Sequence, residues 1–153
     1  LNHYLDSFKG TVYRQTQFAE YEMLTNKMYE EGESLTADNL SSTYLELNKK
    51  YYGSDIVSDD QIAYEWARIP HFYYNFYVYQ YATGYSAAIA LSQRILKENG
   101  KDDYINFLKG GSSKYSIDLL KGAGVDMTTA EPVEKAMEVF ASLLDEMENL
   151  LTE

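Results

Sequence analysis

The chain has 153 residues, a formal net charge of −11 at pH 7 and no cysteine. Without cysteine it can form no disulfide, thiolate metal site or cysteine nucleophile, and the cytoplasm is the default compartment. The acidic balance excludes nucleic acid as a partner, because phosphate binding needs clustered Lys and Arg side chains, and no such cluster is visible. A length of this order predicts one domain.

The start of the chain and its apolar runs bear on location. The sequence enters an amphipathic pattern directly at Leu1, without a charged and then apolar leader, so we expect no secretory signal in this chain. We also expect the chain to be a piece of a longer polypeptide. The longest apolar runs, such as residues 87–91, fall far short of the ~20 residues that span a bilayer. We therefore expect a soluble chain with no membrane partner.

Two helices are predicted in the first third of the chain. Apolar residues spaced three and four apart predict one helix from Leu1 to about Tyr29. Gly32 should follow it in a left-handed turn. A second helix should begin after Thr36, whose hydroxyl can cap the first free amides, and should stop at Gly53.

The middle of the chain gives conflicting signals. Side-chain oxygens at residues 58–60 predict the start of a short helix that Pro70 stops. Tyrosines then alternate with other residues over positions 77–81, as in a strand. Because no second strand-like run exists for pairing, we expect one long helix from about Tyr74 to Glu98.

Three further helices complete the prediction. Two short helices are expected around residues 104–108 and 116–121, between glycine-containing turns. The last should begin near Thr129, carry Pro132 in its first turn and continue to about Leu151. The fold class is therefore all-α, a multi-helix array without internal repeats.

An aromatic stretch stands out from the rest of the chain. Residues 71–85 hold eight aromatic side chains and one of only two histidines. A buried tyrosine must place its hydroxyl on a partner or in water, so this composition indicates a lined cavity rather than an ordinary core. On the predicted long helix, a shared face would carry Tyr74, Tyr77, Tyr81 and Tyr85.

These residues allow two interpretations. A histidine near a helix N-terminus can be held neutral, and His71 could then donate a hydrogen bond to a developing oxyanion, as could the phenols beside it. Alternatively, His71 and the tyrosines are packing residues, which periodicity alone favours. His3 is given no role. No H-E-x-x-H motif occurs, so the chain itself offers no ordinary zinc site.

A family resemblance adds to this reading. The run from Trp66 to Gly84 closely resembles the C-terminal signature of oligoendopeptidase F, within the thimet-oligopeptidase-like family of zinc metallopeptidases; it reads WARIPHFYYNFYVYQYATG. Residues 1–20 resemble the family's sequence just after its active-site helices. Residues 131–140 resemble its final helix.

The resemblance implies a fold, a cofactor and a substrate class. The family is an elongated, all-helical peptidase with a narrow channel that admits unstructured oligopeptides. Its zinc is held by H-E-x-x-H and a later glutamate, all of which would precede Leu1, so zinc is implied for the full-length enzyme and none for this chain. Residues 1–153 would form the C-terminal helical portion of the catalytic domain. The missing N-terminal portion would be their partner.

The resemblance also assigns roles to residues. His71 would face the zinc across the cleft with a tyrosine from the following helix, for which Tyr77 and Tyr81 are the candidates. Tyr74 and Tyr85 are expected to bind substrate. The chain alone should be inactive, and the channel surface that the missing portion would cover should either be exposed or pair in a homo-oligomer. The alternative is a non-catalytic helical domain that binds a peptide or partner helix through its tyrosine-rich face.

Overall fold

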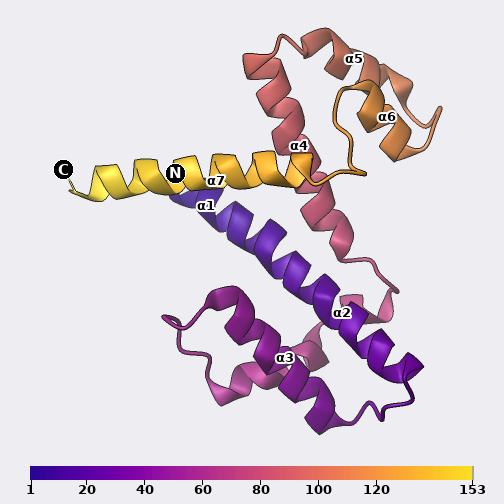
Figure 1. The fold of residues 1–153 in the computed structure, drawn as a ribbon, viewed down its shortest axis with the longest axis vertical. Helices are drawn as coiled ribbons and strands as arrows, with labels where there is room; N and C mark the ends of the chain where they lie inside the picture. The colour runs from indigo at the N-terminus through magenta and orange to yellow at the C-terminus, as the bar shows by residue number, and fades with distance from the viewer. Residues whose placement is uncertain (153) are drawn as a thin grey trace. The chain divides into compact units, whose positions relative to one another are not determined.

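The computed structural model describes residues 1–152, and within them every regular element is helical (Figure 1). This confirms the all-α prediction. The described chain forms two compact units. The central unit comprises Gly10–Ala82, and the terminal unit comprises Leu1–Lys9 with the described residues from Thr83 onward. Their assignment to one peptidase domain stays a prediction.

The central unit holds two α-helices and three short helical segments of other types, one π-helix and two 3-10 helices. The α-helices are α2 (Arg14–Glu30) and α3 (Ala37–Tyr52). The other segments are the π-helix η1 (Lys9–Tyr13), all but its first residue, and the 3-10 helices η2 (Asp60–Arg68) and η3 (Pro70–Tyr73). Helix α3 packs against both α2 and η2. This packing encloses the central core.

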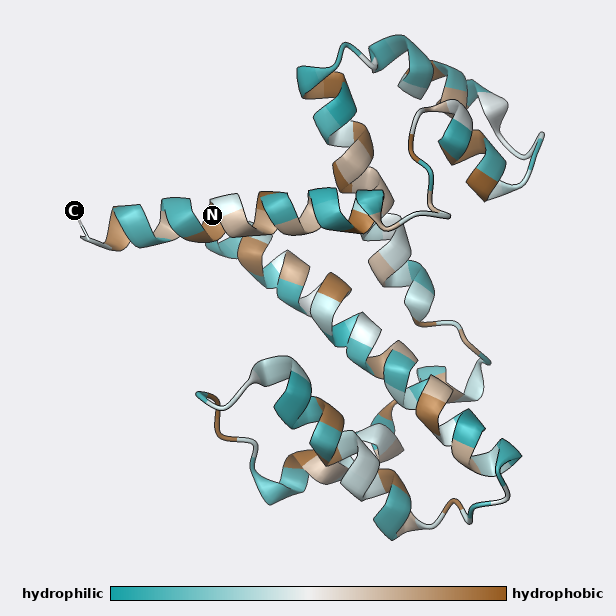
Figure 2. Ribbon diagram, in the orientation of Figure 1, coloured by the Kyte–Doolittle hydropathy of each residue, from teal (hydrophilic) through white to brown (hydrophobic). Residues whose placement is uncertain are grey.

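The terminal unit holds both ends of the described chain. Its elements are α1 (Asn2–Phe8), most of α4 (Tyr79–Lys97), α5 (Lys101–Gly110), α6 (Ser116–Gly122) and α7 (Glu131–Thr152). Helix α1 packs on α7, where the rings of Phe8 and Phe140 lie 5.3 Å apart, and α5 packs on α6. Apolar and polar bands alternate along α7, as its sequence predicts (Figure 2).

The predicted helix boundaries are confirmed where capping chemistry sets them. The Thr36 hydroxyl accepts a hydrogen bond from the Asn39 amide at 3.2 Å, and Asp59 accepts two from the start of η2. Gly32 and Gly53 adopt φ values of 81° and 76° at the helix ends, a region that glycine enters without steric cost.

Two helix predictions were wrong in part. The first helix is not continuous, because a wider π-helical turn over Lys9–Tyr13 separates α1 from α2. The long helix begins at Tyr79 rather than Tyr74. Its expected first turn is broken because Asn75 and Phe76 take left-handed φ values of 39° and 54°, which interrupt an α-helical hydrogen-bond ladder.

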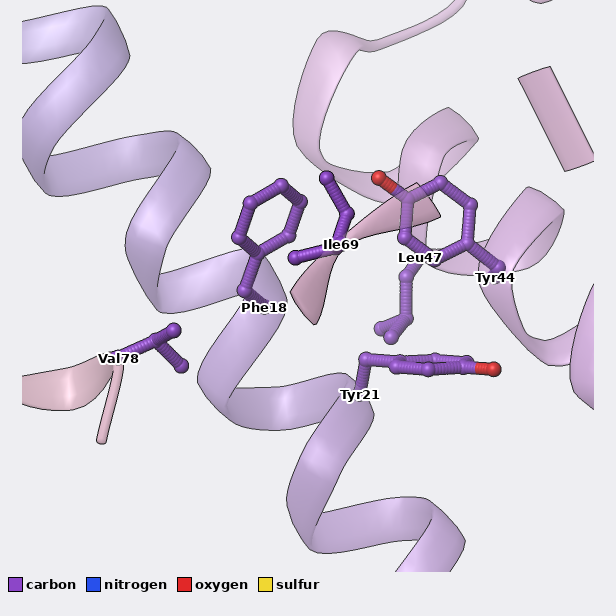
Figure 3. Close-up of a cluster of buried hydrophobic side chains, with 6 residues drawn as sticks. All are labelled: Phe18, Tyr21, Tyr44, Leu47, Ile69 and Val78. Atoms are coloured by element: carbon purple, nitrogen blue, oxygen red, sulfur yellow. The ribbon is translucent and has the colours of Figure 1, made fainter. Parts of the chain in front are cut away.

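Each unit has a buried cluster of its own. In the central unit, aromatic side chains of α2 and α3 converge with aliphatic ones from the segment after η2 (Figure 3), and the cluster consists of Phe18, Tyr21, Tyr44, Leu47, Ile69 and Val78. In the terminal unit, small residues of α4 meet the segment after α6, and the cluster consists of Ala87, Ala90, Leu91, Ala123 and Val125. Among residues 1–152, none of the helices combines the length and the apolar character that a membrane span requires.

Candidate functional site

The turn that carries His71 is fixed by the proline before it. Ile69 is extended (φ −91°, ψ 100°), as a residue before proline prefers, and this ends η2. Pro70 then opens η3, in which the Tyr74 amide bonds the His71 carbonyl at 3.0 Å. Pro70 thus stops one helical turn and starts another, and His71 is left half-buried at its second position.

Apolar residues on both sides of the aromatic stretch anchor it in the central core. The Phe72 ring packs against Phe18 and Tyr21, with ring centroids 5.4 Å and 5.1 Å apart. Val78 is only 1% exposed. Because Phe72 and Val78 point inward, the side chains between them are turned toward the surface.

Three tyrosine rings of this stretch meet around His71. The His71 imidazole lies parallel to the Tyr77 ring, with an interplanar angle of 16° and centroids 5.8 Å apart. Tyr74 and Tyr81 meet the imidazole edge-on at 6.1 Å and 6.4 Å. These are favourable aromatic geometries. The structure therefore brings together His71 and three of the four predicted tyrosines. Of these three, only Tyr81 lies on α4, the helix that was expected to carry all four.

A hydrogen bond joins the phenol groups of Tyr81 and Tyr77, with one as donor and the other as acceptor. The Tyr81 hydroxyl donates to the Tyr77 oxygen at 3.2 Å, and this bond raises the pKa of Tyr81 above its ordinary value. The Tyr81 proton is thereby engaged, whereas the Tyr77 proton stays available to another acceptor. Both side chains are 38% exposed, so a ligand can reach them.

Tyr85 is placed in the terminal unit. Its ring meets Phe8 edge-on at 5.0 Å, and burial raises the pKa of its hydroxyl. The fourth predicted tyrosine therefore packs as part of the terminal unit, and its substrate-binding role stays a prediction.

A buried carboxylate that the sequence analysis missed supports the segment before His71. Glu65 of η2 pairs with Arg14 at 2.6 Å and with Arg68, and it accepts the Tyr44 hydroxyl at 2.6 Å. Burial alone would raise the pKa of Glu65, but these hydrogen bonds and charges lower it. The spacing of Glu65 and Arg68 is visible in the sequence; the pairing with Arg14, 51 residues away, is not.

The described residues do not form a metal centre. No group of three or more His, Cys, Asp or Glu side chains in residues 1–152 could hold a metal ion. The donor set around His71 consists of one imidazole and three phenols, which does not match the ligands of an ordinary zinc site. What this arrangement offers is hydrogen-bond donors at a partly open surface.

Comparison with known proteins assigns the family. The sequence profile of peptidase family M3 matches residues 1–139. The chain belongs to peptidase family M3. The residues of this M3 chain that the family profile matches include His71 and all four predicted tyrosines.

Relatives of this M3 chain are much longer than the chain itself. Oligopeptidase PepF of Bacillus subtilis is 62% identical over 99% of the chain, and group B oligopeptidase PepB of Streptococcus agalactiae is 52% identical over 99%. The crystal structure of oligoendopeptidase-F from Enterococcus faecium superposes with a TM-score of 0.95 at 51% identity. The chain spans 23%, 26% and 29% of these proteins respectively, about a quarter of their length.

Proposed function

We propose that this chain supplies one side of the active site of a zinc metalloendopeptidase that hydrolyses peptide bonds in short, unstructured oligopeptides. The relatives, which are named oligopeptidases and oligoendopeptidases, support this proposal. Zinc, which acts in such enzymes as a Lewis acid, would be held by the N-terminal portion of the same polypeptide rather than by this chain. The residues proposed to act here are donors of hydrogen bonds.

The ring cluster around His71 is the observation that carries the proposal. Negative charge develops on the carbonyl oxygen when a peptide bond becomes tetrahedral, and positioned N–H and O–H donors stabilise that charge. Tyr77 has the available hydroxyl proton, because Tyr81 already donates to it. We therefore assign Tyr77 and His71 as oxyanion donors, Tyr81 as the group that orients Tyr77, and Tyr74 and Tyr85 as substrate-binding residues.

Tyrosine-to-phenylalanine substitutions in the full-length polypeptide test this assignment. Tyr77→Phe and His71→Ala should each lower kcat for a quenched fluorescent oligopeptide by about 10²–10³-fold, the usual effect of losing one oxyanion donor. Tyr81→Phe should have a smaller effect, since it leaves the Tyr77 donor in place. Tyr73→Phe is the matched control, because Tyr73 is 81% exposed beside the cluster. Equal effects of Tyr77→Phe and Tyr73→Phe would overturn the assignment.

The 153-residue chain by itself should have no peptidase activity, because the zinc and the H-E-x-x-H motif that would hold it are proposed to lie outside it. The measurement is cleavage of the same oligopeptide by the purified chain with added zinc. The His71→Ala variant of the chain provides the baseline. Faster cleavage by the unsubstituted chain than by this variant contradicts the proposal.

Two further parts of the proposal concern the compartment of the enzyme and the self-association of the isolated chain. We place the enzyme in the cytoplasm, in line with the cysteine-free sequence. We also propose that the isolated chain self-associates through surface that the rest of the polypeptide would cover. Light scattering that shows a monomer, together with no binding of a dye for apolar surface, would exclude self-association.

A non-catalytic peptide-binding domain is the second candidate. Exposure of Tyr74, Tyr77 and Tyr81, between 38% and 61%, favours it, because exposed phenols can hold a peptide without chemistry. This candidate needs the tyrosines but not His71. Peptide binding by the chain that survives His71→Ala, together with an unchanged kcat of the full-length variant, would support binding over catalysis.

A further inference from the structure

Glu22 of α2 is a buried carboxylate that the proposed chemistry does not use. The residue is 4% exposed. A buried carboxylate is costly unless hydrogen bonds satisfy it. Its Oε1 accepts a hydrogen bond from the backbone amide of Phe76, 54 residues further along the chain. The carboxylate thus reaches from α2 to the middle of the aromatic stretch.

The segment that Glu22 holds has an unfavourable backbone conformation. Asn75 and Phe76 have φ values of 39° and 54°, and two consecutive non-glycine residues in this region are sterically disfavoured. Such a conformation persists only where surrounding contacts determine it. A charge-assisted hydrogen bond from the Phe76 amide to Glu22 is a contact of that kind.

This conformation decides where the Tyr77 ring lies. A helical path from Tyr74, as the sequence predicts, would place Tyr77 one turn along a helix face. Instead the left-handed pair turns the chain sharply between Tyr74 and Val78, and the Tyr77 ring stacks on His71. Val78 then enters the core. The stacking of Tyr77 on His71 therefore depends on the turn.

We propose that Glu22 is a positioning residue that holds Tyr77 against His71 by fixing the left-handed turn at residues 75 and 76. It acts through the backbone of Phe76 and touches no substrate. The value of this positioning for catalysis rests on the proposed function. The positioning itself is a property of the 153-residue chain and can be measured without any activity.

Amide hydrogen exchange and the NMR resonances of the His71 ring test the positioning. Glu22→Leu removes the acceptor, so exchange of the Phe76 amide should accelerate at least tenfold, and the His71 ring protons should lose the ring-current shift from Tyr77. Glu22→Gln keeps an acceptor oxygen without the charge, so exchange should rise only several-fold and the His71 shifts should persist.

Glu20→Leu is the matched control. Glu20 lies two residues earlier on α2, and its carboxylate bonds Lys50 and Tyr51 of α3 instead of the aromatic stretch. Its loss should leave the Phe76 amide and the His71 shifts unchanged. The proposal is overturned if Glu22→Leu and Glu20→Leu affect both signals equally, or if a folded Glu22→Leu leaves them unchanged. If Glu22→Leu does not fold, Glu22→Gln decides, and unchanged exchange at Phe76 overturns the proposal.

Kinetics of the full-length polypeptide separate this inference from the proposed function. Glu22→Leu should lower kcat with little change in KM, whereas Glu22→Gln should keep most of the unsubstituted kcat. Adding Tyr77→Phe to Glu22→Leu should lower kcat little further, because the two residues act through the same group. Loss of Tyr77 stacking with an unchanged kcat would contradict the proposed function and leave the positioning role intact. A lower kcat with intact stacking would contradict the positioning role.

Discussion

The hydroxyl of Tyr44 donates to the Glu65 carboxylate at 2.6 Å, and the tyrosine side chain is fully buried. This bond joins the middle of α3 to η2, the turn that leads into His71. Arg14 of α2 pairs with the same carboxylate. One buried carboxylate thus connects three elements of the central unit.

Removing the Tyr44 hydroxyl should destabilise the chain. Tyr44→Phe leaves a Glu65 oxygen without its buried donor, which we expect to lower the free energy of unfolding by about 1–3 kcal/mol. Urea denaturation with an unchanged m-value measures the loss. Tyr51→Phe is the control: Tyr51 donates to Glu20, whose side chain is 22% exposed, so water replaces the bond and the cost should be about 1 kcal/mol or less. A larger loss for Tyr51→Phe would contradict this account.

The same carboxylate should make stability depend on pH in the acidic range. Although burial raises the pKa of Glu65, hydrogen bonds from Arg14 and Tyr44 outweigh it, so the folded-state pKa lies below the ordinary 4.5. The unfolded chain then binds this proton more tightly than the folded one. The stabilisation is therefore fully present above about pH 4.5 and is lost as the pH falls through the lower folded-state pKa.

Comparison with Glu65→Gln isolates this contribution from the many other acidic groups. The difference in unfolding free energy between the unsubstituted chain and Glu65→Gln should be constant at neutral pH and should shrink as the pH falls below about 4.5. The measurement is urea denaturation of both chains at each pH. A difference that does not change with pH would show that Glu65 is not stabilised as a carboxylate.

The hydrogen bond between Tyr81 and Tyr77 gives a second titration. Because the Tyr81 hydroxyl donates to the Tyr77 oxygen, its proton is held and its pKa is raised above 10.0. Tyr77→Phe removes the acceptor, so the pKa of Tyr81 should fall back toward 10.0. NMR titration of the labelled tyrosine ring carbon measures this shift. Tyr74→Phe keeps the Tyr77 oxygen and should leave the Tyr81 pKa in place; an equal fall in both variants would refute the bond.

Local sequence signals predicted much of this fold. The caps at Thr36 and Asp59 were found because their oxygens act on amides two or three residues away. The turn at residues 75 and 76 was missed because its acceptor, Glu22, lies 54 residues earlier. A single sequence shows no such pairing, and the absence of a second strand-like run favoured one continuous helix.

The residues of the candidate site were predicted from a shared helix face, but the structure brings them together in a different way. Spacings of three and four suggested a shared helix face for the tyrosines. The rings of Tyr74 and Tyr77 do meet His71, but they precede the helix and reach it through the left-handed turn. Composition therefore identified the residues, whereas their geometry depends on a tertiary contact that periodicity does not contain.

A glycine in the terminal unit provides the last prediction. Gly124 has a φ of 80°, and a Cβ atom added there would lie 2.6 Å from Nε of Arg94. The Arg94 guanidinium is itself held by Glu98 at 2.9 Å and Asp103 at 3.2 Å. Gly124→Ala therefore imposes a left-handed alanine and displaces an ion-paired arginine.

We expect Gly124→Ala to lower the unfolding free energy by at least about 1–2 kcal/mol, the cost of the left-handed backbone alone. Gly122→Ala is the matched control, because nothing beyond its chain neighbours and its own helix backbone lies within 4 Å of the added Cβ. Gly122 also closes helix α6, where alanine is favoured over glycine. Its stability should be unchanged or slightly higher. Since Arg94 is the group displaced, Arg94→Ala combined with Gly124→Ala should cost less than the sum of the two single changes. Strict additivity would show that the backbone conformation, and not the arginine, accounts for the whole loss.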